Sequence, residues 1–259
     1  MDGHKLYALS KSERTQNQAQ STDSINTKDV TFESQGILLA GTIYYPKHPQ
    51  AAVVLVHGSD SVPRMTETAE LLAKNDILVL TYDKRGVGDS EGVYAGPEVG
   101  TNNISTEYLN LLAKDASASV HVIRQENKNL PMGLLGFSQA GLIIPIAANE
   151  NSQIEFMVLF SCPTITTLEQ LRFQFYTNGN PDFWENHTEE EAKYHAKNDP
   201  DRYSFEATDP LEALSTLSIP GLWLFGEKDI QIPAKLCIEN LNALKTQGKP
   251  FEYALFPTL

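Results

Sequence analysis

The strongest constraint on the fold is a series of short apolar segments that alternate with segments of helical spacing. Apolar runs of strand length occur at residues 51–56, 77–82, 132–137, 155–160, 221–225 and 251–256. Helical spacing occurs between them, at 66–74, 106–125, 139–149 and 234–246. Runs that are apolar throughout are typical of strands buried on both faces of a sheet. The alternation therefore predicts an α/β fold, a mostly parallel central sheet with helices on both faces.

The start of the chain has a different character. Residues 1–28 are rich in Ser, Thr, Gln, Asn and Lys and lack apolar periodicity, which predicts a flexible tail. Two β-prone segments at 30–34 and 37–45, joined at Gln35-Gly36, predict an antiparallel hairpin. We expect one globular domain over residues 29–259.

One long stretch, residues 163–218, breaks the alternation of strands and helices. It contains crowded aromatic side chains and two helix-start signals, Thr188 with Glu191 and Asp209-Pro210. A segment of this length is too long for a simple loop, so we expect a helical insertion that forms a lid over the carboxyl end of the sheet. Its aromatic side chains would line an apolar acyl pocket or form the core of the lid itself.

Charge and composition exclude some classes of protein. The 259 residues include 20 Lys+Arg and 33 Asp+Glu, a net charge of −13, which argues against a nucleic-acid binder. No run approaches the roughly 18 apolar residues of a membrane helix, and the first residues lack the apolar core of a signal peptide. This favours a cytoplasmic location, with an exported form left open. Cys162 and Cys237 lie in apolar surroundings and are expected to be free thiols. Nothing indicates an oligomeric state.

The most informative motif lies in residues 132–141, Met-Gly-Leu-Leu-Gly-Phe-Ser-Gln-Ala-Gly. Here a strand runs through Gly136 and Ser138 into a helix, the setting of a nucleophile elbow. Such an elbow leaves room only for small residues two positions before and after the serine, and Gly136 and Ala140 occupy these positions. The alternative is a tight strand-to-helix turn that contains a serine by chance.

Two further stretches strengthen the catalytic interpretation. Residues 53–60, Val-Val-Leu-Val-His-Gly-Ser-Asp, are a buried strand that opens into a loop of small residues. The backbone N–H groups of Ser59 and Gln139 would form an oxyanion hole there. Residues 80–92 place three glycines after the next strand, in a pattern that fits neither a Walker loop nor a dinucleotide fingerprint.

Together and in this order, the three stretches resemble the α/β-hydrolase family, most closely its bacterial esterase-like members with a helical lid. The resemblance covers about residues 30–259 and is weakest across the insertion. It continues through Pro145 and through Gly226-Glu227-Lys228-Asp229 after a later strand. Ala140 departs from the family motif, which has glycine at this position.

The resemblance implies roles for individual residues. Ser138 would be the nucleophile, Ser59 and Gln139 the oxyanion donors, and Asp229 the acid that orients a catalytic histidine. The alternative for Asp229 is a turn residue that caps the helix starting near Pro233.

The triad histidine expected by this resemblance has no counterpart in the sequence. In the family it follows the last strand, but no histidine follows Asp229 up to Leu259. The six histidines lie elsewhere: His4, His48, His57, His121, His187 and His195. His57 in the oxyanion loop is expected to be structural. We therefore expect the triad histidine just beyond residue 259, and little activity without it.

The same expectation extends to the fold. We expect the natural chain to continue past Leu259 with a final helix, which would cover the sheet face beside Phe251, Tyr253 and Leu255.

The predicted function is that of a serine hydrolase that cleaves carboxylic esters through an acyl-enzyme intermediate. Thioesterase, peptidase and lactonase activities use the same machinery and stay open. The expected partner is a small-molecule ester substrate. No cofactor or metal is implied, since the histidines lack ligand spacing and acyl transfer needs only protons and water. The alternative is a catalytically inactive hydrolase-fold protein that binds a small acyl ligand or a partner.

Overall fold

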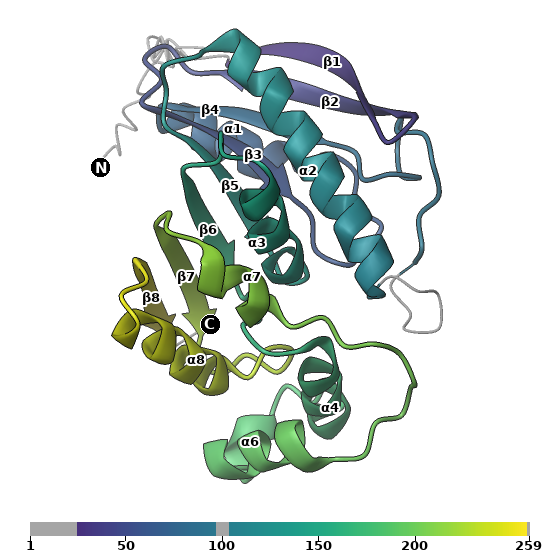
Figure 1. Cartoon of the computed structure of the whole chain (residues 1–259), viewed down its shortest axis with the longest axis vertical. Coiled ribbons are helices and arrows are strands. Elements are labelled where there is room, and N and C mark those ends of the chain that lie inside the picture. The colour runs from purple at the N-terminus through teal and green to yellow at the C-terminus, as the bar shows by residue number, and fades with distance from the viewer. Residues whose placement is uncertain (1–24, 97–103, 258–259) are drawn as a thin grey trace, which may run out of the picture.

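A single mixed sheet forms the centre of the molecule. The structure, a computed structural model, describes residues 25–96 and 104–257. Its strands are β1 (Asn26–Ser34), β2 (Ile37–Tyr45), β3 (Ala51–Val56), β4 (Ile77–Tyr82), β5 (Met132–Phe137), β6 (Phe156–Phe160), β7 (Gly221–Gly226) and β8 (Phe251–Phe256). They follow the order β1-β2-β4-β3-β5-β6-β7-β8 (Figure 1). All pairs are parallel except β1 with β2 and β2 with β4, which confirms the predicted fold class.

The antiparallel hairpin turns at Gln35 and Gly36, as predicted. Both residues have positive φ, 49° and 77°, the conformation of the two-residue turns that suit a twisted hairpin. β1 starts at Asn26, which pairs with Tyr45, so the tail prediction is wrong for residues 26–28. Backbone pairing with β2 extends the strand there although the side chains are polar and exposed. Residues 1–24 of the predicted tail lie outside the described residues.

Helices cover both faces of the sheet and create two hydrophobic cores. They are α1 (Thr66–Lys74), α2 (Thr106–Glu126), α3 (Ala140–Glu150) and α8 (Ala234–Thr246). Figure 1 shows α2 and α3 side by side in front of the sheet, where they share the larger core with α8. On the other face, Ala69 and Ala73 of α1 pack with Val53, Leu55 and Val79 in the smaller core.

The segment between β6 and β7 contains four helices, in the range predicted as an insertion. These are α4 (Thr167–Thr177), α5 (Phe183–Asn186), α6 (Glu189–Asn198) and α7 (Pro210–Thr216). The capping box of Thr188 and Glu191 is confirmed at the start of α6. Figure 1 shows α4 and α6 below the sheet, and ion pairs of Lys193 with Glu239 and of Lys235 with Glu189 join α6 to α8.

Aromatic side chains of the insertion pack mainly against one another. Phe173 contacts Phe183 edge-on at 6.3 Å between ring centroids, and Tyr176 contacts Phe183 at 5.2 Å. Phe173 and Phe183 are fully buried. Of the two expectations for these side chains, the structure therefore favours a core of the insertion itself.

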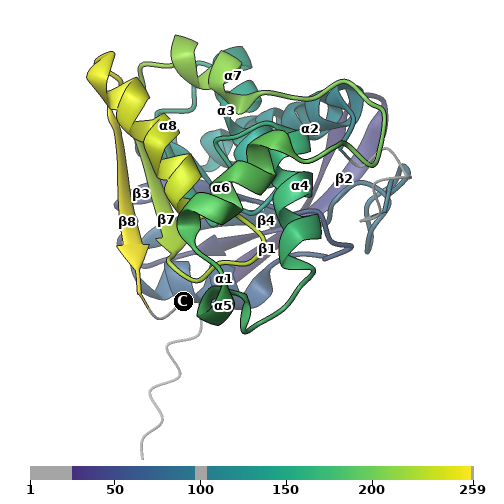
Figure 2. The same ribbon diagram turned by 90° about the horizontal axis from the view of Figure 1, so that it is seen from below.

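The edge formed by β7 and β8 corrects one expectation. The face with Phe251, Tyr253 and Leu255 belongs to the larger core and is covered by α8 (Figure 2). A helix that connects two parallel neighbours packs back onto the strands it joins, so no later helix is needed on this face. The opposite face is the exposed one, because Leu222 and Phe256 keep 38% and 40% of their surface accessible.

Candidate active site

Ser138 occupies a sharp turn between β5 and α3. Its φ of 51° lies in the left-handed region, which costs an L-residue about 1 to 3 kcal/mol. Hydrogen bonds fix the turn: the Ser138 N–H donates to the Phe160 carbonyl at 3.0 Å, and the Gly141 N–H donates to the Ser138 carbonyl at 3.0 Å. The turn thus holds Ser138 at the carboxyl end of the sheet, as a nucleophile elbow would.

Small residues around Ser138 are required because α3 passes close to the sheet. A Cβ on Gly136 would lie 2.4 Å from the Ala140 Cβ and 2.7 Å from the Ile144 Cδ1. A Cβ on Gly141 would lie 2.8 Å from the Cys162 Cβ. Ala140 itself is fully buried against Gly136. Alanine therefore fits where the family motif has glycine, because Gly136 leaves room for its methyl group.

Ser138 opens into a cavity of about 310 Å³ that it shares with Ser59 and Gln139. The other described residues of its wall are Asp60, Ile104, Leu142, Thr167, Gln170, Leu171, Gln174 and Gln231. They come from the loop after β3, the residues just before α2, the helices α3 and α4, and the turn after β7. Gln139 immediately precedes α3, so its N–H lies at a helix N-terminus, where negative charge is favoured. Three of the four predicted site residues thus meet at one cavity.

Asp229 lies in the turn after β7 and borders a different hollow. Its Oδ1 accepts hydrogen bonds from the Gln231 N–H at 2.7 Å and the Ile232 N–H at 3.0 Å. It does not cap α8, whose N-terminal flanking residue is Pro233. The hollow, about 230 Å³, is lined by Phe160, Ser161, Leu224, Phe225, Gly226, Asp229 and Phe256.

None of the described histidines lines the cavity beside Ser138. His57 is buried and packs edge-on against Tyr82 at 5.1 Å. Burial, together with the charge of Lys84, lowers the pKa of His57 to about 4, so its imidazole is neutral at pH 7. His57 is therefore part of the protein core.

Two histidines belong to the insertion. His187 stacks on Phe183 at 4.3 Å, and His195 stacks on Tyr176 at 3.7 Å. His195 also pairs with Asp199 through Nδ1 at 2.9 Å. Both side chains therefore pack within the insertion.

The glycine-rich stretch after β4 supports the neighbouring loops. The Asp83 carboxylate accepts hydrogen bonds from the Arg64 N–H at 2.7 Å, the Arg64 guanidinium at 2.9 Å and the Asp89 N–H at 2.9 Å. Burial acts to raise the pKa of Asp83, but the bonds from Arg64 and Asp89 outweigh it and lower the pKa. A Cβ on Gly88 would lie 2.6 Å from the Asp83 Oδ2, which explains the glycine there.

Sequence reasoning missed Lys84, which lies beneath the loop with Ser59. The Lys84 Nζ donates to the Gly58 carbonyl and, at 3.2 Å, to the Asp60 carbonyl. Only 2% of its surface is accessible, so the side chain is a buried cation. Its place directly after a buried strand, beside Asp83, is the signal that could have revealed it.

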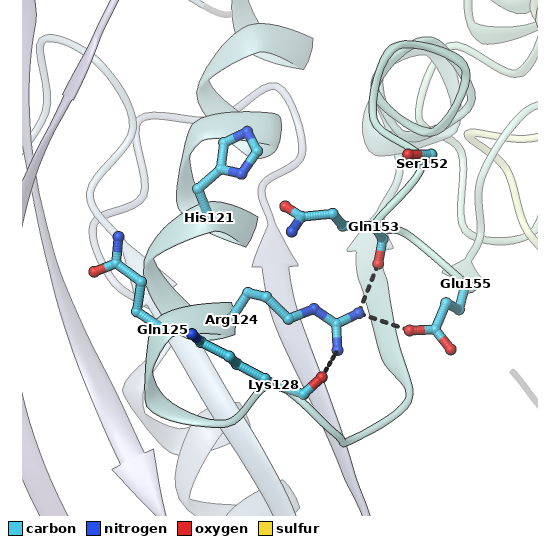
Figure 3. Close-up of a pocket in the computed structure, with 7 residues that line it drawn as sticks. All are labelled: His121, Arg124, Gln125, Lys128, Ser152, Gln153 and Glu155. Atoms are coloured by element: carbon cyan, nitrogen blue, oxygen red, sulfur yellow. Dashed lines mark hydrogen bonds and ion pairs between the residues drawn. The ribbon is translucent and has the colours of Figure 1, made fainter.

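A larger cavity, about 580 Å³, is a surface groove along α2. Figure 3 shows its lining residues, His121, Arg124, Gln125, Lys128, Ser152, Gln153 and Glu155. The Arg124 guanidinium donates to the Leu130 and Gln153 carbonyls and pairs with Glu155 at 2.6 Å. Arg124 is thus occupied in joining α2 to the loops beside it. The groove contains none of the predicted site residues.

The described residues show no feature of a membrane-spanning helix or of a metal site. In residues 25–96 and 104–257, no helix is both long and apolar enough to cross a membrane. Within the same ranges, no group of three or more His, Cys, Asp or Glu side chains is arranged to hold a metal ion.

Comparison with known protein families and curated proteins gives two results. A family model described as serine aminopeptidase, S33 matches residues 47–182. Monoglyceride lipase of Rattus norvegicus is 28% identical over 115 residues, and that of Mus musculus is 30% identical over 115 residues. Each match covers 44% of this chain and 35% of the lipase. The chain therefore matches only about a third of the length of these curated relatives.

Solved structures share the fold at low sequence identity. An esterase of Pyrococcus furiosus aligns with a TM-score of 0.63 and 19% identity, over 90% of this chain and 82% of the esterase. The acylaminoacyl peptidase of Pyrococcus horikoshii aligns with a TM-score of 0.63 and 14% identity, over 91% of this chain and 37% of the peptidase. At this level of identity the likeness concerns the fold alone.

Proposed function

Since the chain belongs to the serine aminopeptidase S33 family, within the α/β-hydrolases, we propose that it hydrolyses carboxylic esters with Ser138 as nucleophile. The observation that carries the proposal is the shared cavity: Ser138, on a turn with positive φ, faces the same space as Ser59 and Gln139. A nucleophile beside two backbone N–H groups is what acyl transfer requires.

The proposed reaction proceeds through an acyl-enzyme. The Ser138 Oγ attacks the ester carbonyl while a histidine takes its proton, and the N–H groups of Ser59 and Gln139 stabilise the oxyanion. The histidine then protonates the departing alcohol as the carbon–oxygen bond of the ester breaks. Water, activated by the same histidine, releases the acid and restores the serine.

We assign the orientation of that histidine to Asp229, and the histidine itself to chain that follows Leu259. Two observations support this. β8 ends at Phe256, on the wall of the hollow that Asp229 borders, so chain leaving β8 starts beside this carboxylate. Among the described residues, hydrogen bonds reach only one of the two carboxylate oxygens of Asp229, Oδ1.

The substrate that suits the cavity is a small, neutral ester with polar groups. Gln170, Gln174 and Gln231 place amide side chains on the wall beside Ser138, and Thr167 adds a hydroxyl. Amides donate and accept hydrogen bonds, so they recognise hydroxyl or amide groups of a substrate better than an alkyl chain.

The decisive experiment is the replacement Ser138→Ala in the full-length protein, assayed with 4-nitrophenyl butyrate. Turnover should fall at least about a thousandfold, because only oxyanion stabilisation and binding would remain. Ser215→Ala is the control, since Ser215 is an exposed serine of α7 that lines neither the cavity of Ser138 nor the hollow of Asp229. It should keep turnover within a few fold.

A fluorophosphonate probe gives an independent readout. Peptide mapping by mass spectrometry should locate the adduct on Ser138. An adduct on a serine other than Ser138, or unchanged turnover in Ser138→Ala, would show that the elbow assignment is wrong. A full-length protein with neither adduct nor turnover would instead support an inactive hydrolase-fold protein that binds an acyl ligand or a partner.

A further inference from the structure

The loop that contains Ser59 is held from beneath by two side chains. Lys84, which follows β4, donates to the carbonyls of Gly58 and Asp60. Tyr94 donates its hydroxyl to the Ser59 carbonyl at 2.7 Å, and the Lys84 ammonium lies 5.5 Å from the centre of the Tyr94 ring. Three consecutive carbonyl oxygens of the loop are therefore bound by these two residues.

Tyr94 reaches this position because the preceding loop contains glycine at a point of close approach. A Cβ on Gly86 would lie 2.1 Å from the Tyr94 nitrogen, and Gly86 has a φ of 74°. Only a residue without a side chain lets the segment of Tyr94 pack so closely against the stretch after Lys84. The glycine-rich stretch thus has a second consequence, which is to bring Tyr94 and Lys84 together under Ser59.

The geometry of a peptide group connects these contacts to the site. The carbonyl of Gly58 and the N–H of Ser59 belong to one peptide unit, and in a trans peptide they point in opposite directions. A cation bound to the carbonyl oxygen orients this unit and strengthens the N–H as a donor, since linked hydrogen bonds polarise one another. Ser59 in turn lines the cavity with Ser138.

We infer that Lys84 is a positioning residue of the oxyanion hole: its ammonium group holds the Gly58–Ser59 peptide and increases the donor strength of the Ser59 N–H. Tyr94 supports the next peptide of the same loop. This inference rests on the proposed ester hydrolysis, in which the Ser59 N–H stabilises the oxyanion. Lys84 itself touches neither the substrate nor the reacting atoms.

The charge of Lys84 gives the inference a pH dependence. Burial lowers the pKa of Lys84 to about 8, an effect partly offset by the Asp60 carboxylate. His57 and Tyr94, which also face Lys84, change their charge in other pH ranges. Burial lowers the pKa of His57 to about 4 and raises the pKa of Tyr94 above its ordinary value of 10.0. An activity change near pH 8 that depends on Lys84 would therefore report its ammonium group.

The test uses the full-length protein and 4-nitrophenyl acetate, with kcat and KM measured from pH 6 to 10. Lys84→Met keeps the length of the side chain and removes the charge. It should lower kcat about ten- to a hundredfold, somewhat less than the loss of a whole oxyanion donor, with KM within about twofold. The natural protein should lose kcat as pH rises through about 8, where Lys84 loses its charge, and Lys84→Met should lack this decline.

Controls separate this effect from loss of folding. Lys74→Met removes an exposed lysine of α1 and should leave kcat unchanged. Tyr94→Phe removes one hydroxyl, at a half-buried side chain, and should lower kcat a few fold without changing the unfolding transition. If Lys84→Met does not fold, Tyr94→Phe and the alkaline decline of the natural protein decide the question.

Several results would overturn the inference. Unchanged kcat in Lys84→Met would do so, as would a rise in KM alone, which would mean a role in substrate binding. Unchanged kcat in Tyr94→Phe together with no decline near pH 8 in the natural protein would also overturn it. Ser138→Ala, assayed in parallel, separates the two claims: if it loses turnover while Lys84→Met does not, the proposed function stands and only the role of Lys84 fails.

Discussion

At the scale of single residues, glycines determine how closely the elements around Ser138 pack. Gly136 and Gly58 flank Ser138 on different elements, but their surroundings differ. A Cβ on Gly136 would lie 2.4 Å from the Ala140 Cβ, whereas a Cβ on Gly58 would lie 3.4 Å from the Phe137 carbonyl oxygen, an ordinary contact. The two glycines therefore allow a direct test of close packing beside the turn at Ser138.

We predict that Gly136→Ala destabilises the protein by about 1 to 3 kcal/mol, because α3 must move away from β5 to accept the methyl group. Gly58→Ala is the matched control and should change the free energy of unfolding by less than about 0.5 kcal/mol. Urea unfolding followed by circular dichroism measures both variants. Equal stabilities would mean that the approach of α3 to Gly136 is looser than the structure shows.

At the scale of elements, α4 determines the chemical character of the cavity. Thr167, Gln170, Leu171 and Gln174 lie on the side of this helix that borders the cavity, at the spacing of one face. The start of α4 is fixed by a capping box in which the Thr166 hydroxyl accepts from the Glu169 N–H. Rotation of α4 about its axis would turn these side chains away from the cavity and bring others to its wall. The capping and packing of the helix therefore control which groups line the cavity.

We predict that Gln170→Met changes substrate preference and leaves stability nearly unchanged. The variant should lose about fivefold in kcat/KM for 4-nitrophenyl 3-hydroxybutyrate relative to 4-nitrophenyl butyrate, the value of roughly one hydrogen bond. Gln125→Met, on the exposed groove of α2, is the control and should keep the ratio of the natural protein. An unchanged ratio in Gln170→Met would show that the Gln170 amide does not determine the preference between the two esters.

At the scale of the whole molecule, a buried ion pair joins three distant parts of the chain. The Arg85 guanidinium donates to both oxygens of Asp115, at 2.6 Å and 2.8 Å, and the Ser34 hydroxyl donates to the same carboxylate at 2.5 Å. These residues come from β1, the stretch after β4, and α2. The pair thus anchors the N-terminal hairpin and the loop of Lys84 to the helix that covers the sheet.

We predict that Asp115→Ala lowers the free energy of unfolding by about 3 to 5 kcal/mol, since it leaves the Arg85 charge buried without its partner. Glu252→Ala, which breaks the exposed pair with Lys245, is the control and should cost less than about 1 kcal/mol. Chemical denaturation of both variants at pH 7 provides the comparison. A small effect of Asp115→Ala would mean that water or another group solvates Arg85 in the variant.

Much of the fold could be predicted because periodicity is a local property. The strands Ala51–Val56, Ile77–Tyr82 and Met132–Phe137 were predicted with the bounds that the structure shows. Apolar runs mark buried strands wherever they occur, and the turns between them carry glycine or proline. Where polar residues join a strand through backbone pairing alone, as at Asn26, the pattern contains no signal, and the prediction was wrong.

The sequence by itself determined the α/β fold and the strand-to-helix turn at Ser138, because both follow from residues that are neighbours in the chain. Tertiary structure alone decided that Lys84 lies beneath Ser59, that the amides of α4 face the cavity, and that α8 covers the face of Phe251. These contacts join residues far apart in sequence, and they depend on how helices pack on the sheet. No local pattern encodes such distances, because packing is set by the shapes of all the elements together.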